Sequence, residues 1–113
     1  MSHPIDYIEI YVTDMAETTA FYGTAFGWTF TEYAPTYVGI QKPGGGEFGG
    51  FEQVESVSKG GCLVVLRSED LEASLAAVEA AGGTILKPIF SFPGGRRFRF
   101  ADPSGNELAV WSS

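Results

Sequence analysis

The sequence predicts an α+β fold made of two βαβββ modules, and three observations lead to this prediction. Two segments with helical periodicity begin at capping residues with acidic side chains nearby and end at glycine. Each of them follows a strand-like segment and precedes three more. A shift of 56 residues places Asp14 on Asp70 and Gly27 on Gly83, so the same order of elements occurs twice. An internal repeat whose side chains have diverged has this pattern.

Length and composition indicate one folded domain over residues 1–113, with module 1 at about 4–56 and module 2 at about 60–113. The chain is 44% hydrophobic and 14% aromatic, and no apolar run approaches the roughly 20 residues that span a bilayer. Residues 1–4 lack the features of a signal peptide. A single cysteine, Cys62, agrees with a reducing compartment, so we expect a cytoplasmic protein that does not act on membranes.

The net charge of −7 disfavours nucleic acid as a partner, because such binding depends on basic side chains that neutralise phosphates. Residues 1–56 hold one basic and eight acidic side chains, whereas residues 57–113 hold six of each. Arg96, Arg97 and Arg99 crowd into one predicted strand. They are either solvated charges paired with surface acids or a clamp for a carboxylate or phosphate on a small ligand.

In the first half, residues 4–12 alternate between apolar and polar side chains and predict a strand. Thr13 or Asp14 caps the helix that follows, and Gly27 ends it. Further strands are expected at 28–32, 37–41 and 48–54, with a glycine-rich turn at 42–46 that is typical of a mobile flap rather than a phosphate loop.

The second half follows the same plan, with Ser68 as the expected cap of its helix and Gly82 and Gly83 as its end. Strands are expected at 62–67, 84–90, 97–100 and 107–111. The last two flank the turn Asp102–Asn106, whose residues favour the corners of a hairpin.

Strand alternation sorts side chains onto two faces of each sheet. Each helix covers one face of its own sheet, and the opposite, concave faces are expected to line one cleft. The concave residues are then Tyr7, Glu9 and Tyr11 in module 1 and Leu63, Arg67, Ala109 and Trp111 in module 2. The same parity places Cys62 on the helix side, as a buried and inert thiol.

These concave residues are the candidate ligand-binding residues. Tyr7 and Tyr11 can bind through their hydroxyls or rings, and Trp111 can form an aromatic wall, although all three can also simply fill the concave side. Glu9 is either a general base whose pKa is raised among tyrosines or a carboxylate that is solvated or paired with Arg67. No catalytic residue is assigned.

The whole chain resembles the vicinal oxygen chelate superfamily, also called the glyoxalase, bleomycin-resistance and dioxygenase superfamily. The resemblance is carried by the segments I-E-I-Y-V-T-D-M-A-E-T-T-A-F-Y-G-T-A-F-G-W at 8–28, S-E-D-L-E-A-S-L-A-A-V-E-A-A-G-G at 68–83 and F-A-D-P-S-G-N-E-L-A-V-W at 100–111. It is most similar to small members described as related to lactoylglutathione lyase. The resemblance implies paired βαβββ modules that form a cupped mixed sheet with helices on its convex side, and commonly a homodimer.

Enzymes of this superfamily hold a divalent metal ion with histidine and glutamate side chains. Counted along the motifs, the corresponding positions here are Tyr7, Leu63 and Ala109, with a fourth at Glu52 or Gln53. Tyrosine, leucine and alanine do not supply the donors of such a site. We therefore expect no metal in the family position and no cofactor; His3, the one histidine, lies in the N-terminal segment.

The resulting expectation is a glyoxalase- or bleomycin-resistance-like protein that binds a small molecule without the family's metal. One alternative is a lyase, isomerase or dioxygenase-type enzyme that uses Glu9, Tyr7 or an unfamiliar metal site. Another is a dimeric interaction protein without catalysis, whose cup is filled by its own side chains. The expected partners are a small-molecule ligand and a second copy of the chain.

Overall fold

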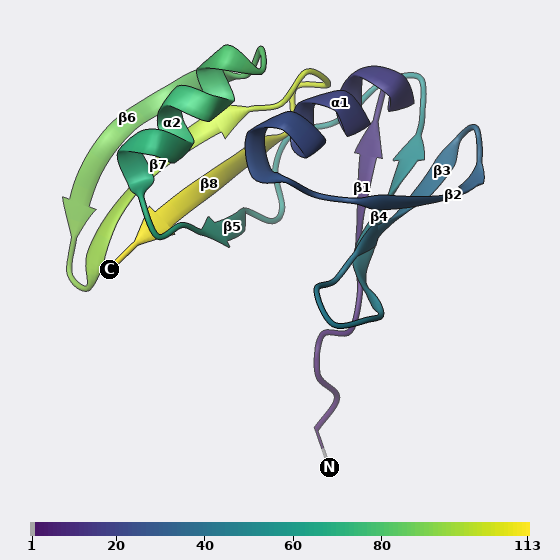
Figure 1. Ribbon diagram of the computed structural model, residues 1–113, viewed down its shortest axis with the longest axis horizontal. Helices are drawn as coiled ribbons and strands as arrows, with labels where there is room; N and C mark the ends of the chain where they lie inside the picture. Colours follow the sequence, from purple (N-terminus) through teal and green to yellow (C-terminus); the bar gives the residue numbers. More distant parts are fainter. Residues whose placement is uncertain (1) are drawn as a thin grey trace.

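The computed structural model, which describes residues 2–113, contains two helices and eight strands in that range (Figure 1). The first half holds β1 (Ile8–Val12), α1 (Met15–Phe26), β2 (Phe30–Ala34), β3 (Tyr37–Gln41) and β4 (Glu47–Gln53). The second half holds β5 (Val64–Arg67), α2 (Leu71–Ala80), β6 (Thr84–Phe92), β7 (Gly95–Ala101) and β8 (Glu107–Ser112). The predicted α+β fold of two βαβββ units is confirmed.

The eight strands form two four-stranded sheets (Figure 1). Sheet 1 has the order β1-β4-β3-β2 and sheet 2 the order β5-β8-β7-β6. In each, the strand before the helix pairs in parallel with the last strand of its unit, and the other pairs are antiparallel. The edge strands β1 and β5 are not joined by a strand ladder, so the chain forms two mixed sheets rather than one continuous cupped sheet.

Local capping chemistry sets where the helices begin and end. Of the two expected caps of α1, Thr13 and Asp14, the structure has Asp14, whose carboxylate accepts a hydrogen bond from the Glu17 amide at 2.9 Å. Gly27 ends α1 with a φ of 72°. In α2 the cap is Asp70, which accepts from the Ala73 amide at 3.1 Å. The expected cap, Ser68, lies two residues before Asp70, and its hydroxyl accepts a hydrogen bond from the Asp70 amide.

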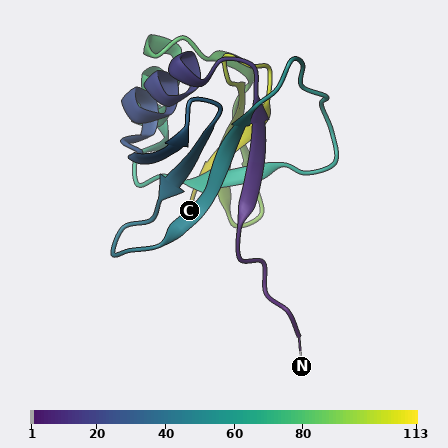
Figure 2. The same ribbon diagram turned by 90° about the vertical axis from the view of Figure 1, so that its right-hand side faces the viewer.

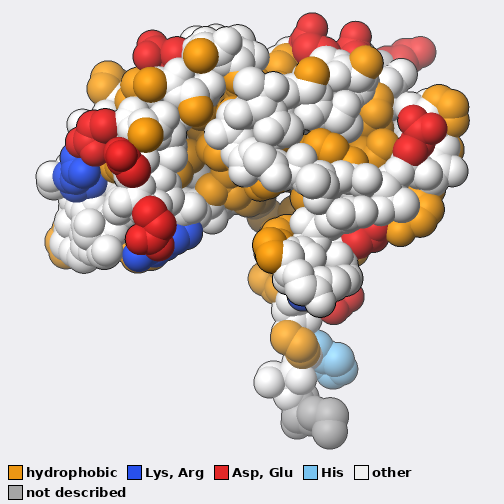
Figure 3. All heavy atoms as spheres, in the orientation of Figure 1, with side chains coloured by type: hydrophobic (Ala, Val, Ile, Leu, Met, Phe, Trp, Pro, Cys, Tyr) orange, Lys and Arg blue, Asp and Glu red, His pale blue; other side chains and the backbone are white. Residues whose placement is uncertain are grey.

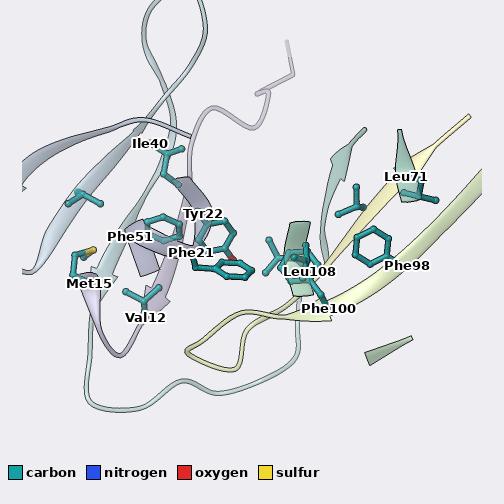
Figure 4. Packing of buried hydrophobic residues seen from close by; sticks show 13 residues of the cluster. Val12, Met15, Phe21, Tyr22, Ile40, Phe51, Leu71, Phe98, Phe100 and Leu108 are labelled. Atoms are coloured by element: carbon teal, nitrogen blue, oxygen red, sulfur yellow. The ribbon is translucent and has the colours of Figure 1, made fainter. Parts of the chain in front are cut away.

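A single hydrophobic core joins the two modules (Figure 4). Phe21 and Tyr22 on α1 are almost fully buried, and their rings contact Phe51 of β4 and Phe100 of β7. The ring centroids of Phe21 and Phe100 are 6.0 Å apart. Because α1 contributes to both halves, neither sheet buries its helix-facing side independently of the other.

The hairpin turn before β8 also joins the modules. The Tyr22 hydroxyl donates to Asp102 at 2.9 Å, and both residues are buried. The Asn106 side-chain amide donates to the Tyr11 carbonyl at 2.7 Å, and the Thr13 amide donates to the Ser104 hydroxyl at 2.9 Å. The turn that the sequence predicted at 102–106 therefore positions the end of β1 against module 2.

Three predicted strands begin later than expected. Trp28 and Thr29 precede β2, which begins at Phe30. Residues 4–7 precede β1 and leave the body of the molecule as an extended segment (Figure 2). Cys62 and Leu63 precede β5, whose ladder with β8 starts at Val64 and Leu108. Cys62 is exposed, which contradicts the expected buried thiol, because residues outside the ladder do not follow the alternation of the strand. No helix of the described chain has the length and apolarity needed to cross a bilayer.

Candidate functional site

Each sheet has an open face, opposite the face that packs against its helix. In sheet 1, Val38, Ile40 and Phe51 face α1 and are buried. Their neighbours on the same strands therefore face the other way, and these include Tyr37, Gly39, Gly50 and Glu52. Glu9 on β1 pairs in register with Gly50, so it belongs to the same open face.

Two glycines form the floor of the open face of sheet 1. Gly39 and Gly50 lie opposite each other on β3 and β4. A Cβ atom on Gly50 would collide with the hydroxyls of Tyr7 and Tyr37, and one on Gly39 would collide with the Glu47 carboxylate. The missing side chains at these two positions allow polar groups to lie directly on the sheet.

A cluster of tyrosines and carboxylates covers this glycine floor. The hydroxyls of Tyr7 and Tyr37 are hydrogen-bonded to each other. Burial raises the pKa of Tyr37, and the neighbouring Tyr7 hydroxyl and Glu9 carboxylate raise it further. The Tyr33 hydroxyl donates to Glu47 at 2.7 Å, and this bond raises the pKa of Tyr33. The phenols of Tyr33 and Tyr37 thus keep their protons at neutral pH and can donate hydrogen bonds.

A pocket of about 1260 Å³ borders this cluster. Its walls include Tyr7, Tyr33 and Glu47 from the cluster, the ring of Trp28, and the glycine-rich turn at 42–46. Its lining therefore combines hydroxyls, a carboxylate and an aromatic ring.

The open face of sheet 2 is basic and aromatic. One row of neighbours across the strands is formed by Arg67, Trp111, Arg97 and Phe90. The Arg67 guanidinium carbon lies 5.0 Å from the centroid of the Trp111 ring. In the next row, Ala109 is fully buried beside Arg99, whose guanidinium donates to Glu107 at 3.1 Å. Lys and Arg side chains accordingly lie mainly over the module 2 half of the molecule (Figure 3).

The seven predicted site residues form two sets on different sheets. The open face of sheet 1 holds Tyr7 and Glu9, while the Tyr11 side chain is 51% exposed and forms no side-chain hydrogen bond in the described chain. Sheet 2 holds the other set, with Arg67 against Trp111, Ala109 in the adjacent row, and Leu63 half-buried just before β5. Within residues 2–113, no side-chain hydrogen bond or ion pair joins the two open faces.

A separate pocket of about 480 Å³ lies where the modules meet, and it is mainly apolar. Ile8 and Ile10 line it from the helix side of sheet 1, and Val64, Leu66 and Arg67 line it from β5. The hydrophobic side chains visible in the recess between the two halves agree with this apolar character (Figure 3). Within one chain, this pocket between the modules is therefore lined from sheet 1 by residues of its helix side.

Sequence reasoning did not single out Tyr33, Tyr37 and Glu47. Strand parity would have placed Tyr37 with Gly39 on the open face, because both alternate with buried Val38 and Ile40. Glu47 could not have been found in this way, because a register shift between Ile40 and Gln41 changes the pairing at the start of β4.

The family's metal positions do not suit a metal ion here. Tyr7 is hydrogen-bonded to Tyr37, and Leu63 and Ala109 carry only hydrocarbon. Of the two candidates for the fourth position, Gln53 accepts from the Met15 amide at 2.9 Å, which leaves Glu52 on the open face. Within residues 2–113, no three His, Cys, Asp or Glu side chains are arranged to hold a metal ion.

The fold places the chain among α+β proteins built from paired βαβββ modules. It superposes on a glyoxalase-related enzyme from Fulvimarina pelagi with a TM-score of 0.83 at 22% identity, covering 99% of this chain and 89% of that one. It also superposes on TnmS3, an antibiotic binding protein from Streptomyces sp. CB03234, with a TM-score of 0.71 at 20% identity, covering 99% and 96% of the two chains.

Residues 4–110 match the Glyoxalase/Bleomycin resistance protein/Dioxygenase superfamily. A glyoxylase-like domain-containing protein from Didymella fabae is 32% identical over 116 residues, which cover 94% of this chain and 91% of that protein. The chain belongs to this superfamily, as its sequence motifs predicted.

Proposed function

We propose that this protein binds a small organic molecule on the open faces of its sheets, without a metal ion at the family's ligand positions. The observation that carries the proposal is the cluster of Tyr7, Tyr37 and Glu9 over the glycine floor, beside a pocket of about 1260 Å³. Polar groups that converge at the edge of such a pocket can orient a ligand whose apolar part contacts Trp28. The fold is shared with an antibiotic-binding protein, so it is compatible with binding alone.

We further propose that the working form is a homodimer in the cytoplasm. The open face of sheet 1 carries the carboxylates of Glu9, Glu47 and Glu52, whereas that of sheet 2 carries arginines. Charge complementarity of this kind favours an arrangement in which the sheet 1 face of one copy lies opposite the sheet 2 face of another, with the ligand-binding cleft between them. Light scattering on the purified protein should give twice the mass of the chain, and the mass of a single chain would contradict this arrangement.

One observation favours enzymatic chemistry as a second candidate. The Glu9 carboxylate lies close enough to the Tyr37 phenol to raise the pKa of the phenol, so a carboxylate that can accept a proton from a ligand lies beside a hydroxyl that keeps its own and can donate a hydrogen bond. Under this alternative, turnover of a superfamily-type substrate would show a pH profile that Glu9→Gln abolishes. Unchanged turnover by that variant would remove Glu9 from the chemistry.

The binding proposal is tested with 2-naphthol, a flat neutral probe with one hydroxyl. Isothermal titration calorimetry should detect binding to the wild type, and Tyr7→Phe should weaken it about fivefold because one hydrogen bond of about 1 kcal/mol is lost. Tyr11→Phe is the matched control, since the Tyr11 hydroxyl forms no hydrogen bond in residues 2–113. Equal affinity of all three proteins, or no binding, would refute the proposed site.

A further inference from the structure

The structure separates the three neighbouring arginines of β7 by their partners. Arg96 faces α2, where it forms a two-pronged ion pair with Glu72 at 2.5 and 3.2 Å. Arg99 lies on the open face and is paired with Glu107 at 3.1 Å. Arg97, on the same open face, forms neither an ion pair nor a side-chain hydrogen bond within residues 2–113.

Part of the Arg97 guanidinium is buried without a hydrogen-bond partner, and this indicates a position that an anionic ligand could complete. Its Nε atom is buried and has no acceptor. Removing part of a cation from water costs free energy unless an acceptor compensates for the lost hydration. The two terminal nitrogens are not completely enclosed and have no acceptor within residues 2–113, and their planar fork fits the two oxygens of one carboxylate.

Aromatic rings surround this guanidinium. The guanidinium carbon of Arg97 lies 5.5 Å from the ring centroid of Phe90 and 5.7 Å from that of Phe92. On the other side, Trp111 is its register neighbour on β8. A ligand that reaches the fork must therefore lie against flat apolar surfaces, which favours a planar aromatic body over an aliphatic one.

The charges on this face favour an anionic ligand. Arg99 is already neutralised by Glu107, and Arg67 lies against Trp111 with Glu69 3.9 Å away. Arg97 is thus the arginine of this face that has no carboxylate partner within residues 2–113. Lys87, the register neighbour of Arg99, forms no ion pair in the described chain either, and its ammonium lies 4.1 Å from the centroid of the Phe90 ring. The face therefore offers an anion two cations without carboxylate partners, and the planar fork of Arg97 is the one that matches the two oxygens of a carboxylate.

We propose that the open face of sheet 2 binds the carboxylate of a planar aromatic acid, with the Arg97 guanidinium as the group that holds it. This inference rests on the proposed function, because it names the ligand class for the sheet 2 side of the site. Arg67 and Trp111, stacked in the same row, form the wall along which the aromatic body lies.

The test compares 2-naphthoate with three related probes by isothermal titration calorimetry at neutral pH. The wild type should bind 2-naphthoate, and Arg97→Gln should weaken that binding at least tenfold, because a charge-assisted pair of hydrogen bonds is lost. Arg96→Gln is the matched control. It removes the same charge at the neighbouring residue, but on the opposite face of the sheet, where Arg96 is paired with Glu72. It should change the affinity less than twofold.

Results of three kinds would overturn the inference. The first kind is no binding of 2-naphthoate to the wild type, or equal losses of affinity in Arg97→Gln and Arg96→Gln. The second is equal or tighter binding of 2-naphthyl phosphate, which would make the site one for phosphate. The third is equal binding of cyclohexanecarboxylate, which would remove the aromatic requirement, or of 2-naphthamide, which would remove the charge requirement.

The two proposals fail separately in this design. Binding of 2-naphthol that depends on Tyr7, together with no binding of 2-naphthoate, would leave the proposed function standing and refute the role of Arg97. Binding of 2-naphthoate that depends on Arg97, without any effect of Tyr7→Phe on 2-naphthol, would support the sheet 2 site and refute the sheet 1 site.

Discussion

Tyr22 connects the first helix to the last hairpin, and replacing it with phenylalanine tests whether this contact holds the modules together. The side chain is fully buried, and its hydroxyl donates to the Asp102 carboxylate at 2.9 Å. A hydrogen bond to a charged acceptor contributes about 1.5–3 kcal/mol. Asp102 keeps three other donors, namely the amides of Ser104 and Asn106 and the Asn106 side chain, so Tyr22→Phe should cost about 1.5 kcal/mol, the lower end of that range.

The same substitution should change the pH dependence of stability. Burial raises the pKa of Tyr22 well above its ordinary value, and the charge of Asp102 raises it further. Above about pH 10 the unfolded chain loses the phenol proton while the folded chain keeps it, so the stability that this group contributes below pH 10 is lost as the pH rises. The loss is about 1.4 kcal/mol per pH unit for one proton.

Urea denaturation at pH 8, 10 and 11 measures both effects. Tyr22→Phe should be less stable than the wild type at pH 8 and should lose about 1 kcal/mol less between pH 10 and 11, because about half of this phenol is already ionised in the unfolded chain at pH 10. Tyr33 and Tyr37 also have raised pKa values, so the variant will keep part of the alkaline slope. Tyr11→Phe, at an exposed position, is the control and should match the wild type. An unchanged slope in Tyr22→Phe would refute the reasoning.

Two further predictions concern the core and the metal. Phe100→Ala should lower the free energy of unfolding by about 3–5 kcal/mol, because the ring is fully buried between the modules. Phe48→Ala, at a half-exposed ring, is the control and should lower it by less than about 1 kcal/mol. Equal losses of the two variants in urea denaturation would contradict a shared core. Zn²⁺, Ni²⁺, Mn²⁺ or Fe²⁺ should neither copurify near one ion per chain nor raise the melting temperature, since Tyr7, Leu63 and Ala109 occupy the family's ligand positions. Elemental analysis with thermal shift decides this, and a bound ion with a clear rise would overturn the metal-free proposal.

Short-range patterns in the sequence determined the order and type of every element. The alternation around Ile10 and Val12, the Asp14 cap and the Gly27 stop depend on residues within one turn or one strand, so they could be interpreted without the fold. The family motifs were sufficient to identify the superfamily. The ends of the strands were less predictable. Cys62 continues the alternating pattern of β5 in the sequence, but it precedes the strand ladder and is exposed.

The tertiary structure alone decided which side chains meet. Tyr22 and Asp102 are 80 residues apart in the chain, and no periodicity in the sequence connects them. The sequence alone does not distinguish Arg96, Arg97 and Arg99. Their places on the two faces of β7 determine that Arg96 and Arg99 form ion pairs and that Arg97 forms none within residues 2–113. Local structure follows from neighbours along the chain, whereas pairing between distant side chains depends on how the two sheets pack around their common core.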